Sequence, residues 1–179
     1  MLPGSTSRVD YLSLIDRSKL HYKRSDVTPI FAEPAAFAAL VNDLVAPWAK
    51  DRPPVERVVG TDALGFILGT ALALKLGVGF VPVRKGGKLP VKHERVAYRD
   101  YSGVEKTFEL RAEPWPTGTR VLLVDDWIET GATAKAAVEL IERAGGVGVG
   151  LAAIAFRKNE KTAELWAKYR CHGVWPEQA

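Results

Sequence analysis

Two adjacent carboxylates, Asp125 and Asp126, begin the stretch of the chain whose residue types are best suited to chemistry, DDWIETGAT. Acids in such a position can hold the hydroxyl groups of a sugar or a hydrated Mg²⁺ ion, which takes hard oxygen ligands. Further along, Thr130 and Thr133 add hydroxyl donors around Gly131 without adding charge. These residue types favour a ligand that presents hydroxyl groups and a metal ion.

The flanking residues predict the elements that position these side chains. Residues 121–124 are a short apolar run, typical of a strand buried on both faces of a parallel sheet. Apolar residues then recur at helical spacing over 134–141, and two glycines at 145 and 146 stand where a helix ends. We expect the free N–H groups of this helix to face a phosphate at the carboxyl end of the strand.

Carboxylates beside a phosphate site are unfavourable unless the ligand also brings hydroxyl groups and a metal ion. Phosphoribosyl pyrophosphate has a 5′-phosphate, a 2′,3′-diol and a Mg²⁺-bound pyrophosphate, and it fits this set of groups. The alternative is a plain strand–turn–helix, in which an Asp caps the helix and the threonines form a turn. A phosphate-binding P-loop is excluded, because no G-x-x-x-x-G-K-[ST] pattern occurs in the sequence.

The composition is that of a globular chain. Its 179 residues, 47% hydrophobic and 26% charged, are enough for one domain with a substantial core. The net charge of +4 suits an anionic ligand, but the basic residues are scattered, and we expect no nucleic-acid partner. A single cysteine, Cys171, and a start without the layout of a signal peptide indicate the cytoplasm. Lys75, Gly77 and Gly79 interrupt the apolar window 65–83, which predicts a helix and a strand rather than a membrane span.

Strands and helices alternate along the chain, which predicts an α/β fold with an open, mainly parallel sheet flanked by helices. Residues 26–30, in an N-terminal arm at 1–32, are predicted as a turn or an extended segment, because the residue before Pro29 avoids the helical region. Pro34 opens a helix that ends near Pro47. The further predicted elements are a strand at 57–59, a loop at 60–65, a helix at 66–76, a strand at 78–83, a flexible basic loop at 84–90, a β-hairpin or flap within 91–111, a strand at 147–156 and a helix at 161–169.

The central stretch resembles the ribose-phosphate-binding motif of the type I phosphoribosyltransferases. That motif has a hydrophobic strand, two acids, two apolar residues, a variable residue and Thr-Gly-x-Thr. The similarity covers roughly residues 20–170 and is greatest to the adenine phosphoribosyltransferases of the family. It rests on DVTPI at 26–30, GTDALGF at 60–66, VPVRKGGKLP at 81–90 and, in the flap, DYSG at 100–103.

The resemblance implies the type I phosphoribosyltransferase fold as a single domain over 1–179, with residues 1–32 as a small N-terminal hood and 84–111 as a flexible β-hairpin flap. It implies an enzyme that transfers the 5-phosphoribosyl group of phosphoribosyl pyrophosphate to a purine-like nucleobase, either adenine or a 6-oxopurine. The cofactor would be Mg²⁺, and the protein a homodimer.

The resemblance also assigns roles to individual residues. The 5′-phosphate would be held by Thr130, Gly131, Ala132 and Thr133. The pyrophosphate would be held by Asp62, Ala63, Leu64 and Gly65 and neutralised by Arg84 and Lys88. The ribose diol, and the metal through ligand or water, would be held by Asp125 and Asp126. Catalytic roles would fall to Asp125 and Asp126, to Tyr101 closing over the site, and to Glu129 beside the base.

Three residues depart from the adenine enzymes. Leu64 stands where the family has an arginine on the pyrophosphate, and an apolar side chain cannot replace a bidentate cation. Glu129 and Arg157 stand where the hypoxanthine-guanine enzymes of the superfamily carry an acid and a basic residue, so together they predict recognition of a 6-oxopurine or another oxo-substituted base. The alternative is that Glu129 faces solvent or caps the helix while Arg157 lies along the surface.

Two functional hypotheses follow. The first is the phosphoribosyltransferase, favoured by the basic loop and Tyr101. The second is a non-catalytic regulatory protein that binds phosphoribosyl pyrophosphate or a nucleotide, favoured by Leu64.

Overall fold

The computed structural model describes residues 10–18, 25–99 and 103–176. The chain divides into two compact units, residues 1–43 and 44–179. The arm predicted at 1–32 lies within the first unit, which continues into helix α2 (Pro34–Val45). That both units act as a single domain stays a prediction.

The second unit carries the sheet and the helices that cover it. Its elements are β1 (Arg57–Thr61), α3 (Leu64–Leu76), β2 (Gly79–Lys85), β3 (His93–Arg99), β4 (Glu105–Arg111), β5 (Arg120–Ile128), α4 (Ala132–Arg143), β6 (Val147–Phe156), α5 (Ala163–Lys168) and β7 (Arg170–Gly173).

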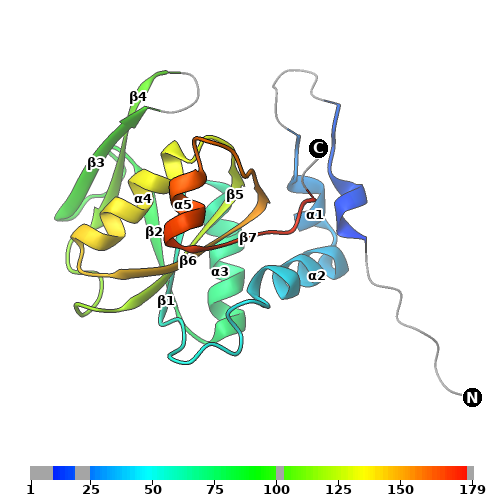
Figure 1. Ribbon diagram of the computed structural model, residues 1–179, viewed down its shortest axis with the longest axis horizontal. Coiled ribbons are helices and arrows are strands. Elements are labelled where there is room, and N and C mark those ends of the chain that lie inside the picture. Colours follow the sequence, from blue (N-terminus) through cyan, green and yellow to red (C-terminus); the bar gives the residue numbers. More distant parts are fainter. Residues whose placement is uncertain (1–9, 19–24, 100–102, 177–179) are drawn as a thin grey trace, which may run out of the picture. The chain divides into compact units, whose positions relative to one another are not determined.

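In the described part of the chain seven strands form one sheet, in the order β3-β4-β2-β1-β5-β6-β7 (Figure 1). Strands β2, β1, β5, β6 and β7 run parallel, while β3 and β4 form an antiparallel hairpin that joins the sheet through β2. The predicted open, mainly parallel sheet with a hairpin is confirmed. The strand order reverses between β1 and β5, because the chain leaves β1 toward β2 and leaves β5 toward β6.

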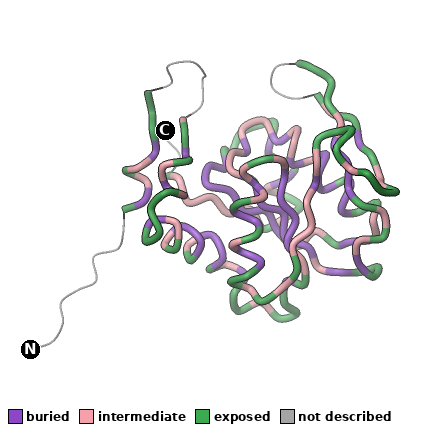
Figure 2. The backbone as a smooth tube through the Cα atoms, turned by 180° about the vertical axis from the view of Figure 1, so that it is seen from behind, coloured by how far each residue is buried: buried purple, intermediate pink, exposed green. Residues whose placement is uncertain are grey.

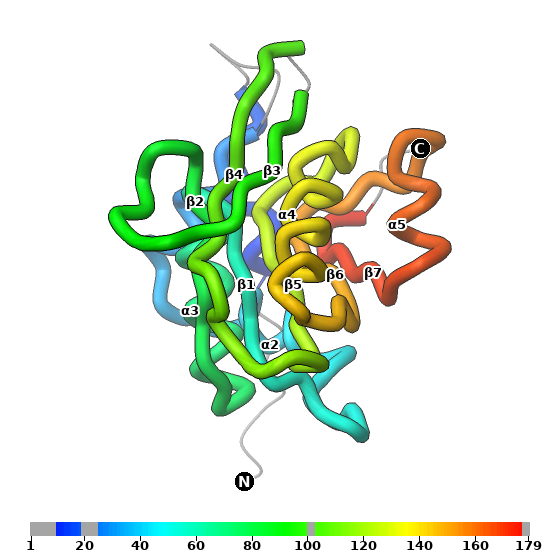
Figure 3. The backbone as a smooth tube through the Cα atoms, turned by 90° about the vertical axis from the view of Figure 1, so that its left-hand side faces the viewer, coloured from blue at the N-terminus to red at the C-terminus, as the bar shows by residue number. Residues whose placement is uncertain are grey.

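Helices cover the two faces of the sheet. Helix α3 lies on one face, and α4 and α5 lie on the other (Figure 3). This follows from right-handed crossovers that lead from adjacent strands in opposite directions. The central strands are buried between them (Figure 2). Val58, Val59 and Leu122 are fully inaccessible to solvent. None of the helices in the described ranges is long and apolar enough to cross a membrane.

The first unit contains a 3-10 turn (η1, Tyr11–Leu14), a short helix α1 (Thr28–Ala32) and most of α2. The prediction of a turn or extended segment over 26–30 is wrong from Thr28 on, where helix α1 begins, whereas Asp26 forms an isolated antiparallel β-bridge with Asp16. The Asp26 carboxylate accepts the backbone N–H and the hydroxyl of Thr28, at 2.9 and 2.7 Å. Asp26 precedes the N-cap residue Val27, and its carboxylate satisfies the N–H of Thr28, the first helical residue; Pro29 lies where its missing N–H is not needed.

Several boundaries in the second unit differ from the predictions. Strand β5 extends to Ile128 instead of ending at 124, and β2 extends to Lys85. Helix α3 starts two residues earlier than predicted, and α5 is shorter at both ends. Strand β7 was not predicted, because its four residues are too few and too polar for a strand pattern. The predicted starts of α2 at Pro34 and of β6 at Val147 are confirmed.

Candidate active site

The acid pair lies where two central strands separate. The pairing of β1 with β5 ends at Gly60 and Val124, whereas β5 stays paired with β6 up to Ile128. Asp125 and Asp126 therefore belong to a part of β5 that has a neighbour on one side only. The sequence placed them at the end of the strand; the structure places them inside it, at the point where the strand order reverses. Open α/β sheets form ligand crevices at such points.

Two glycines allow the start of α3 to approach this opening closely. A Cβ atom on Gly65 would lie 2.8 Å from the Val124 carbonyl oxygen and 3.4 Å from Asp125 Oδ1. A Cβ atom on Gly60 would lie 2.1 Å from the Gly65 carbonyl oxygen. Side chains at these positions would push the loop away, so the glycines bring residues 62–65 against the acid pair.

Asp125 is buried, with 7% of its surface exposed. Burial, and then the negative charge of Asp126, raise the pKa of the Asp125 carboxyl well above the ordinary aspartate value, while a hydrogen bond from the Thr61 side chain lowers it. The backbone N–H of Asp126 donates to Asp125 Oδ1 at 2.9 Å. Because the two carboxylates repel each other when both are ionised, the pair favours a cation or a hydroxyl donor beside it.

This acid pair fits Mg²⁺ in one particular mode. Among the described residues no cluster of three or more His, Cys, Asp or Glu side chains could form a closed metal site. Mg²⁺ usually keeps several waters and is held by one or two carboxylates together with substrate phosphates. Asp125 and Asp126 supply that number of carboxylates, and a cation beside them would relieve their repulsion.

The loop after β5 leads into α4 through a left-handed residue. Gly131 has φ 74° and is the N-cap of the helix, and the Lys135 N–H donates to its carbonyl at 2.8 Å. Glycine has no side chain that could accept the N–H groups of the first helical turn, so a ligand anion can take that place. Thr130, Ala132 and Thr133 flank it and are all partly exposed.

The loop between β1 and α3 carries the other predicted phosphate residues. Asp62 pairs with Lys85, whose Nζ lies 3.5 Å from Asp62 Oδ1. Ala63 is the N-cap of α3, and Leu64, half-buried, is its first residue. Sequence reasoning missed Lys85. Lys85 could have been found by extending the predicted strand β2 past Val83. Side chains alternate along a strand, so Lys85 then lies on the same face as Val83.

Arg84 and Lys88 lie at either end of the turn that follows β2. The Arg84 guanidinium donates to the Lys88 carbonyl at 2.8 Å. Among the described residues the buried Arg84 Nε meets no acceptor. The turn itself contacts the buried carboxylate of Glu109, which the sequence did not single out.

Glu129 and Arg157 are brought together, as the interpretation of an oxo-base site requires. Glu129 follows β5 and Arg157 follows β6, with 4.0 Å between Glu129 Oε1 and Arg157 Nε. The Asn159 side chain donates to the Glu129 carbonyl at 2.9 Å, and the Thr162 hydroxyl donates to the Arg157 carbonyl at 2.7 Å. These bonds fix the backbone, while both charged side chains are about half exposed (43% and 55%) and so form a weak pair.

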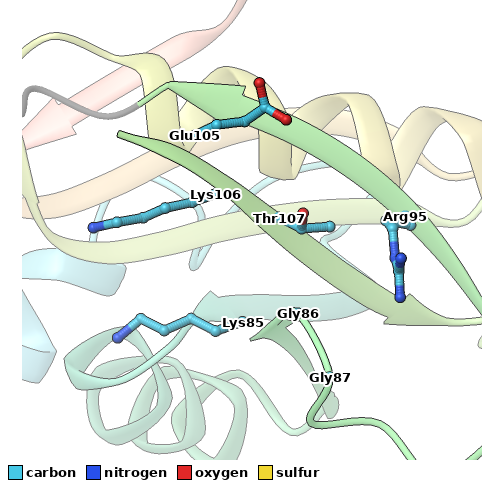
Figure 4. Close-up of a pocket in the computed structure, with 7 residues that line it drawn as sticks. All are labelled: Lys85, Gly86, Gly87, Arg95, Glu105, Lys106 and Thr107. Atoms are coloured by element: carbon cyan, nitrogen blue, oxygen red, sulfur yellow. The ribbon is translucent and has the colours of Figure 1, made fainter. Parts of the chain in front are cut away.

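A pocket of about 460 Å³ lies beside the hairpin (Figure 4). Its lining consists of Lys85, Gly86, Gly87, Arg95, Glu105, Lys106 and Thr107. Residues 125–133 contribute nothing to this lining, so the pocket is separate from the acid pair. Tyr101, predicted to close over the site, lies outside the described residues.

The acid pair lies at the point where the strand order of an open sheet reverses, and a Thr-Gly loop and a helix N-terminus follow it. This arrangement is typical of a class of ribose-phosphate-binding proteins. The sequence profile of the phosphoribosyl transferase domain matches residues 30–175. The chain belongs to this phosphoribosyltransferase family, and the prediction of a type I phosphoribosyltransferase enzyme is confirmed.

Its relatives within the family include adenine phosphoribosyltransferases. The enzyme of Streptomyces galbus is 48% identical over 130 residues, which cover 72% of this chain and 69% of the relative. The structure of the Rhodothermus marinus enzyme matches with a TM-score of 0.81 and 35% identity over 92% of this chain and 94% of the other. The Saccharomyces cerevisiae enzyme, solved with D-2,5-dideoxy-2,5-imino-altritol 1,6-bisphosphate and adenine, matches with a TM-score of 0.81 and 29% identity, covering 92% and 96%.

Proposed function

We propose that this chain transfers the 5-phosphoribosyl group of phosphoribosyl pyrophosphate to adenine, yielding adenosine 5′-monophosphate and pyrophosphate. The observation that carries the proposal is the position of the acid pair. It lies at the end of β5 that is no longer paired with β1, against the loop 60–65, which begins and ends with a glycine. The adenine phosphoribosyltransferases among its relatives support the choice of reaction and base.

In the proposed complex, the N–H groups at the start of α4 and the hydroxyls of Thr130 and Thr133 bind the 5′-phosphate. This uses the positive end of the helix dipole and requires no cationic side chain. Asp125 and Asp126 accept hydrogen bonds from the ribose diol. Their negative charge also stabilises the positive charge that develops on the sugar ring as pyrophosphate leaves.

The pyrophosphate lies along residues 62–65, with Arg84, Lys85 and Lys88 neutralising its charge. The Arg84 Nε, which meets no acceptor within the described ranges, supports an anion at this place. Mg²⁺, when bound with the substrate, would be held through ligand oxygens and water by the acid pair, and it supplies charge neutralisation for the departing pyrophosphate.

The reaction needs no nucleophile from the protein. The N9 atom of the base forms a bond to C1′ of the ribose, the bond from C1′ to the pyrophosphate oxygen breaks with its electron pair, and the proton of the base is released. Catalysis then consists of positioning and electrostatics. The role of Tyr101 as a closing residue remains a prediction.

Adenine is the proposed base, and the relatives give no support to a 6-oxopurine acceptor or to a non-catalytic regulator. Glu129 and Arg157 lie close to each other, but both are exposed and their backbones alone are fixed. Because both side chains are exposed, they do not hold hydrogen-bond donors in a fixed position from which to select an oxo group. We therefore propose that the two residues lie near the base but do not determine which base is bound.

A homodimer is proposed for the assembly, with the outer surface of α3 in the contact. This helix has no polar face: its exposed positions include Ile67 and Leu74, at 42% and 78% exposed, and Lys75 is its sole charged residue. A helix that is apolar all round is usually buried. The cytoplasmic location and the absence of a nucleic-acid partner stay predictions from the sequence.

The test is nucleotide formation from phosphoribosyl pyrophosphate and Mg²⁺ with adenine, hypoxanthine and guanine, each product identified by mass. We expect adenosine monophosphate, no product without Mg²⁺, and little product from the 6-oxopurines. Inosine or guanosine monophosphate as the main product would restore the oxo-base interpretation of Glu129 and Arg157. If phosphoribosyl pyrophosphate binds but no base reacts, the chain is a regulatory protein instead.

A further inference from the structure

Glu109 is a charged residue buried inside the sheet. It lies in β4 between Phe108 and Leu110, and its exposed fraction is 0%. Alternation along the strand directs it to the face opposite those two core residues. A carboxylate in such a place is costly unless hydrogen bonds compensate for the lost water.

The compensation comes mainly from the turn that follows β2. Three consecutive backbone N–H groups donate to Glu109: Gly87 to Oε1 at 2.8 Å, and Lys88 and Leu89 to Oε2 at 3.2 and 3.3 Å. The Arg95 guanidinium donates to Oε1 at 3.0 Å, and His93 Nε2 lies 3.4 Å away. The Gly87 hydrogen bond is the main cause that lowers the pKa of Glu109 to about 2, so the side chain is ionised at neutral pH.

The turn bound in this way carries Lys88 and directly follows Arg84 and Lys85 of β2, the other cations proposed to neutralise pyrophosphate. Arg84 lies directly opposite Glu109 in the β2–β4 register. The Lys88 backbone is held at both ends, since its N–H donates to Glu109 and its carbonyl accepts from Arg84. Glu109, the Lys88 backbone and Arg84 therefore form one connected chain of hydrogen bonds.

The turn has little else to fix its shape. Gly86, Gly87 and Lys88 are all exposed, and Gly87 has φ 78°, a conformation that glycine adopts without restricting it. The Gly86 N–H donates to the Thr107 carbonyl at 2.8 Å and extends the strand pairing by one residue. Beyond that point, the hydrogen bonds recorded for the turn run to Glu109 from three of its N–H groups and from Arg84 to the Lys88 carbonyl.

We propose that Glu109 is a positioning residue that sets the geometry of Arg84 and Lys88 toward the pyrophosphate of the substrate. It does so as an anion whose two oxygens gather successive N–H groups of the turn. This inference rests on the proposed function, and it adds that affinity for pyrophosphate-bearing ligands depends on a side chain that does not touch them.

The experiment compares the full-length wild type with Glu109→Gln. The amide keeps the shape but loses the charge, and its NH₂ group faces an N–H donor of the turn. We expect the KM for phosphoribosyl pyrophosphate to rise about tenfold or more, because hydrogen bonds to charged groups are the strong ones. The KM for adenine and the dissociation constant of adenosine monophosphate, which lacks pyrophosphate, should stay within about twofold.

Two further variants separate positioning from charge. Glu105→Gln removes a negative charge from an exposed position on the same strand and should leave the KM for phosphoribosyl pyrophosphate unchanged. Glu109→Asp keeps the charge on a shorter side chain that cannot reach all of the turn, and it should give an intermediate KM. A net-charge effect would instead lower the KM in both Gln variants, because each removes a negative charge that repels the anionic substrate, so an equal fall in both would overturn the positioning role.

Hydrogen exchange on the wild type tests the same inference without any variant. The amides of Gly87, Lys88 and Leu89 should exchange slowly for a turn whose residues 86–88 are exposed, because each is bonded to a buried carboxylate. Exchange as fast as in an unbonded turn would overturn the inference, even if Glu109→Gln failed to fold.

The outcomes also distinguish this inference from the proposed function. If the wild type forms no nucleotide, the proposed function fails and the exchange result still reports on the turn. If the wild type is active and Glu109→Gln has an unchanged KM for phosphoribosyl pyrophosphate, the positioning role is wrong. If Glu109→Gln loses adenosine monophosphate affinity to the same extent, the defect is general and the positioning role is equally wrong.

Discussion

Ionisation of the Asp125 carboxyl is costly, because the group is buried from water and lies next to a second acid, Asp126. Its raised pKa means that the folded protein binds a proton there more tightly than the unfolded chain does. The contribution of this carboxyl to the free energy of unfolding is therefore fully present below the ordinary aspartate pKa of 3.8. It is lost as the pH rises through the higher pKa of the folded state. In the ligand-free protein at neutral pH, Asp125 opposes folding.

Asp125→Asn should consequently raise the melting temperature of the ligand-free protein at pH 7. The gain should shrink as the pH falls toward 3.8 and disappear below it, where the wild-type carboxyl is protonated in the unfolded chain as well as in the folded protein. Activity should fall about 10- to 100-fold, the usual cost of losing a residue that supports a metal indirectly. Thermal melts at several pH values, with nucleotide formation measured in parallel, check both parts. A lower melting temperature at pH 7 would contradict the argument.

Leu64 gives a second prediction for a single residue. It is the first residue of α3, and it has an apolar side chain where the family pattern has an arginine. Leu64→Arg should lower the KM for phosphoribosyl pyrophosphate by about tenfold, the effect of adding one charge-assisted hydrogen bond. Leu64→Gln, which has similar length and no charge, is the matched control and should change the KM little. Steady-state kinetics with varied phosphoribosyl pyrophosphate would show whether this position matters at all; an unchanged KM in both variants would mean that it does not.

At the scale of elements, the sequence predicted the helices and strands that have a local pattern of apolar residues. It did not predict the features that arise from contacts between segments far apart in the chain. The apolar run before Asp125 and the helical spacing after it predicted β5 and α4, since both patterns are local. That β5 continues through the acid pair follows from its pairing with β6 alone, which no local pattern contains. The approach of Gly65 to Val124, and the hydrogen bonds from the turn to Glu109, likewise join segments far apart in the chain.

The close approach of α3 to β5 gives the prediction at this scale. Gly65→Ala would place a Cβ atom 2.8 Å from a backbone oxygen, and relief requires movement of the helix start. We expect a loss of about 1–3 kcal/mol in the free energy of unfolding, as for other overpacked sites, together with weaker binding of phosphoribosyl pyrophosphate. Gly79→Ala is the control, because its Cβ would meet the flexible Arg57 side chain at 3.3 Å. Chemical denaturation of both variants checks the difference; equal losses would contradict it.

At the scale of the whole molecule, the surface of α3 bears on assembly. Leu74→Glu would place a charge on the exposed surface of α3 that is proposed to form the contact. We expect the mass in solution to fall from twice the chain mass of 19.6 kDa to a single chain. Val147→Glu changes another exposed apolar residue, at the start of β6, and should leave the dimer intact. Light scattering after gel filtration distinguishes the two, and a Leu74→Glu dimer would place the interface elsewhere.

Cys171 gives the molecule a further property. It is the single cysteine of the chain, it lies partly buried in β7, and burial raises the pKa of its thiol to about 12. At neutral pH the thiol therefore stays protonated, whereas the thiolate is the form that reacts with maleimides. The natural chain thus behaves as an almost cysteine-free background. A cysteine introduced at Val104, an exposed residue beside the connection between β3 and β4, would take up a fluorophore selectively and test whether the hairpin moves when the substrate binds.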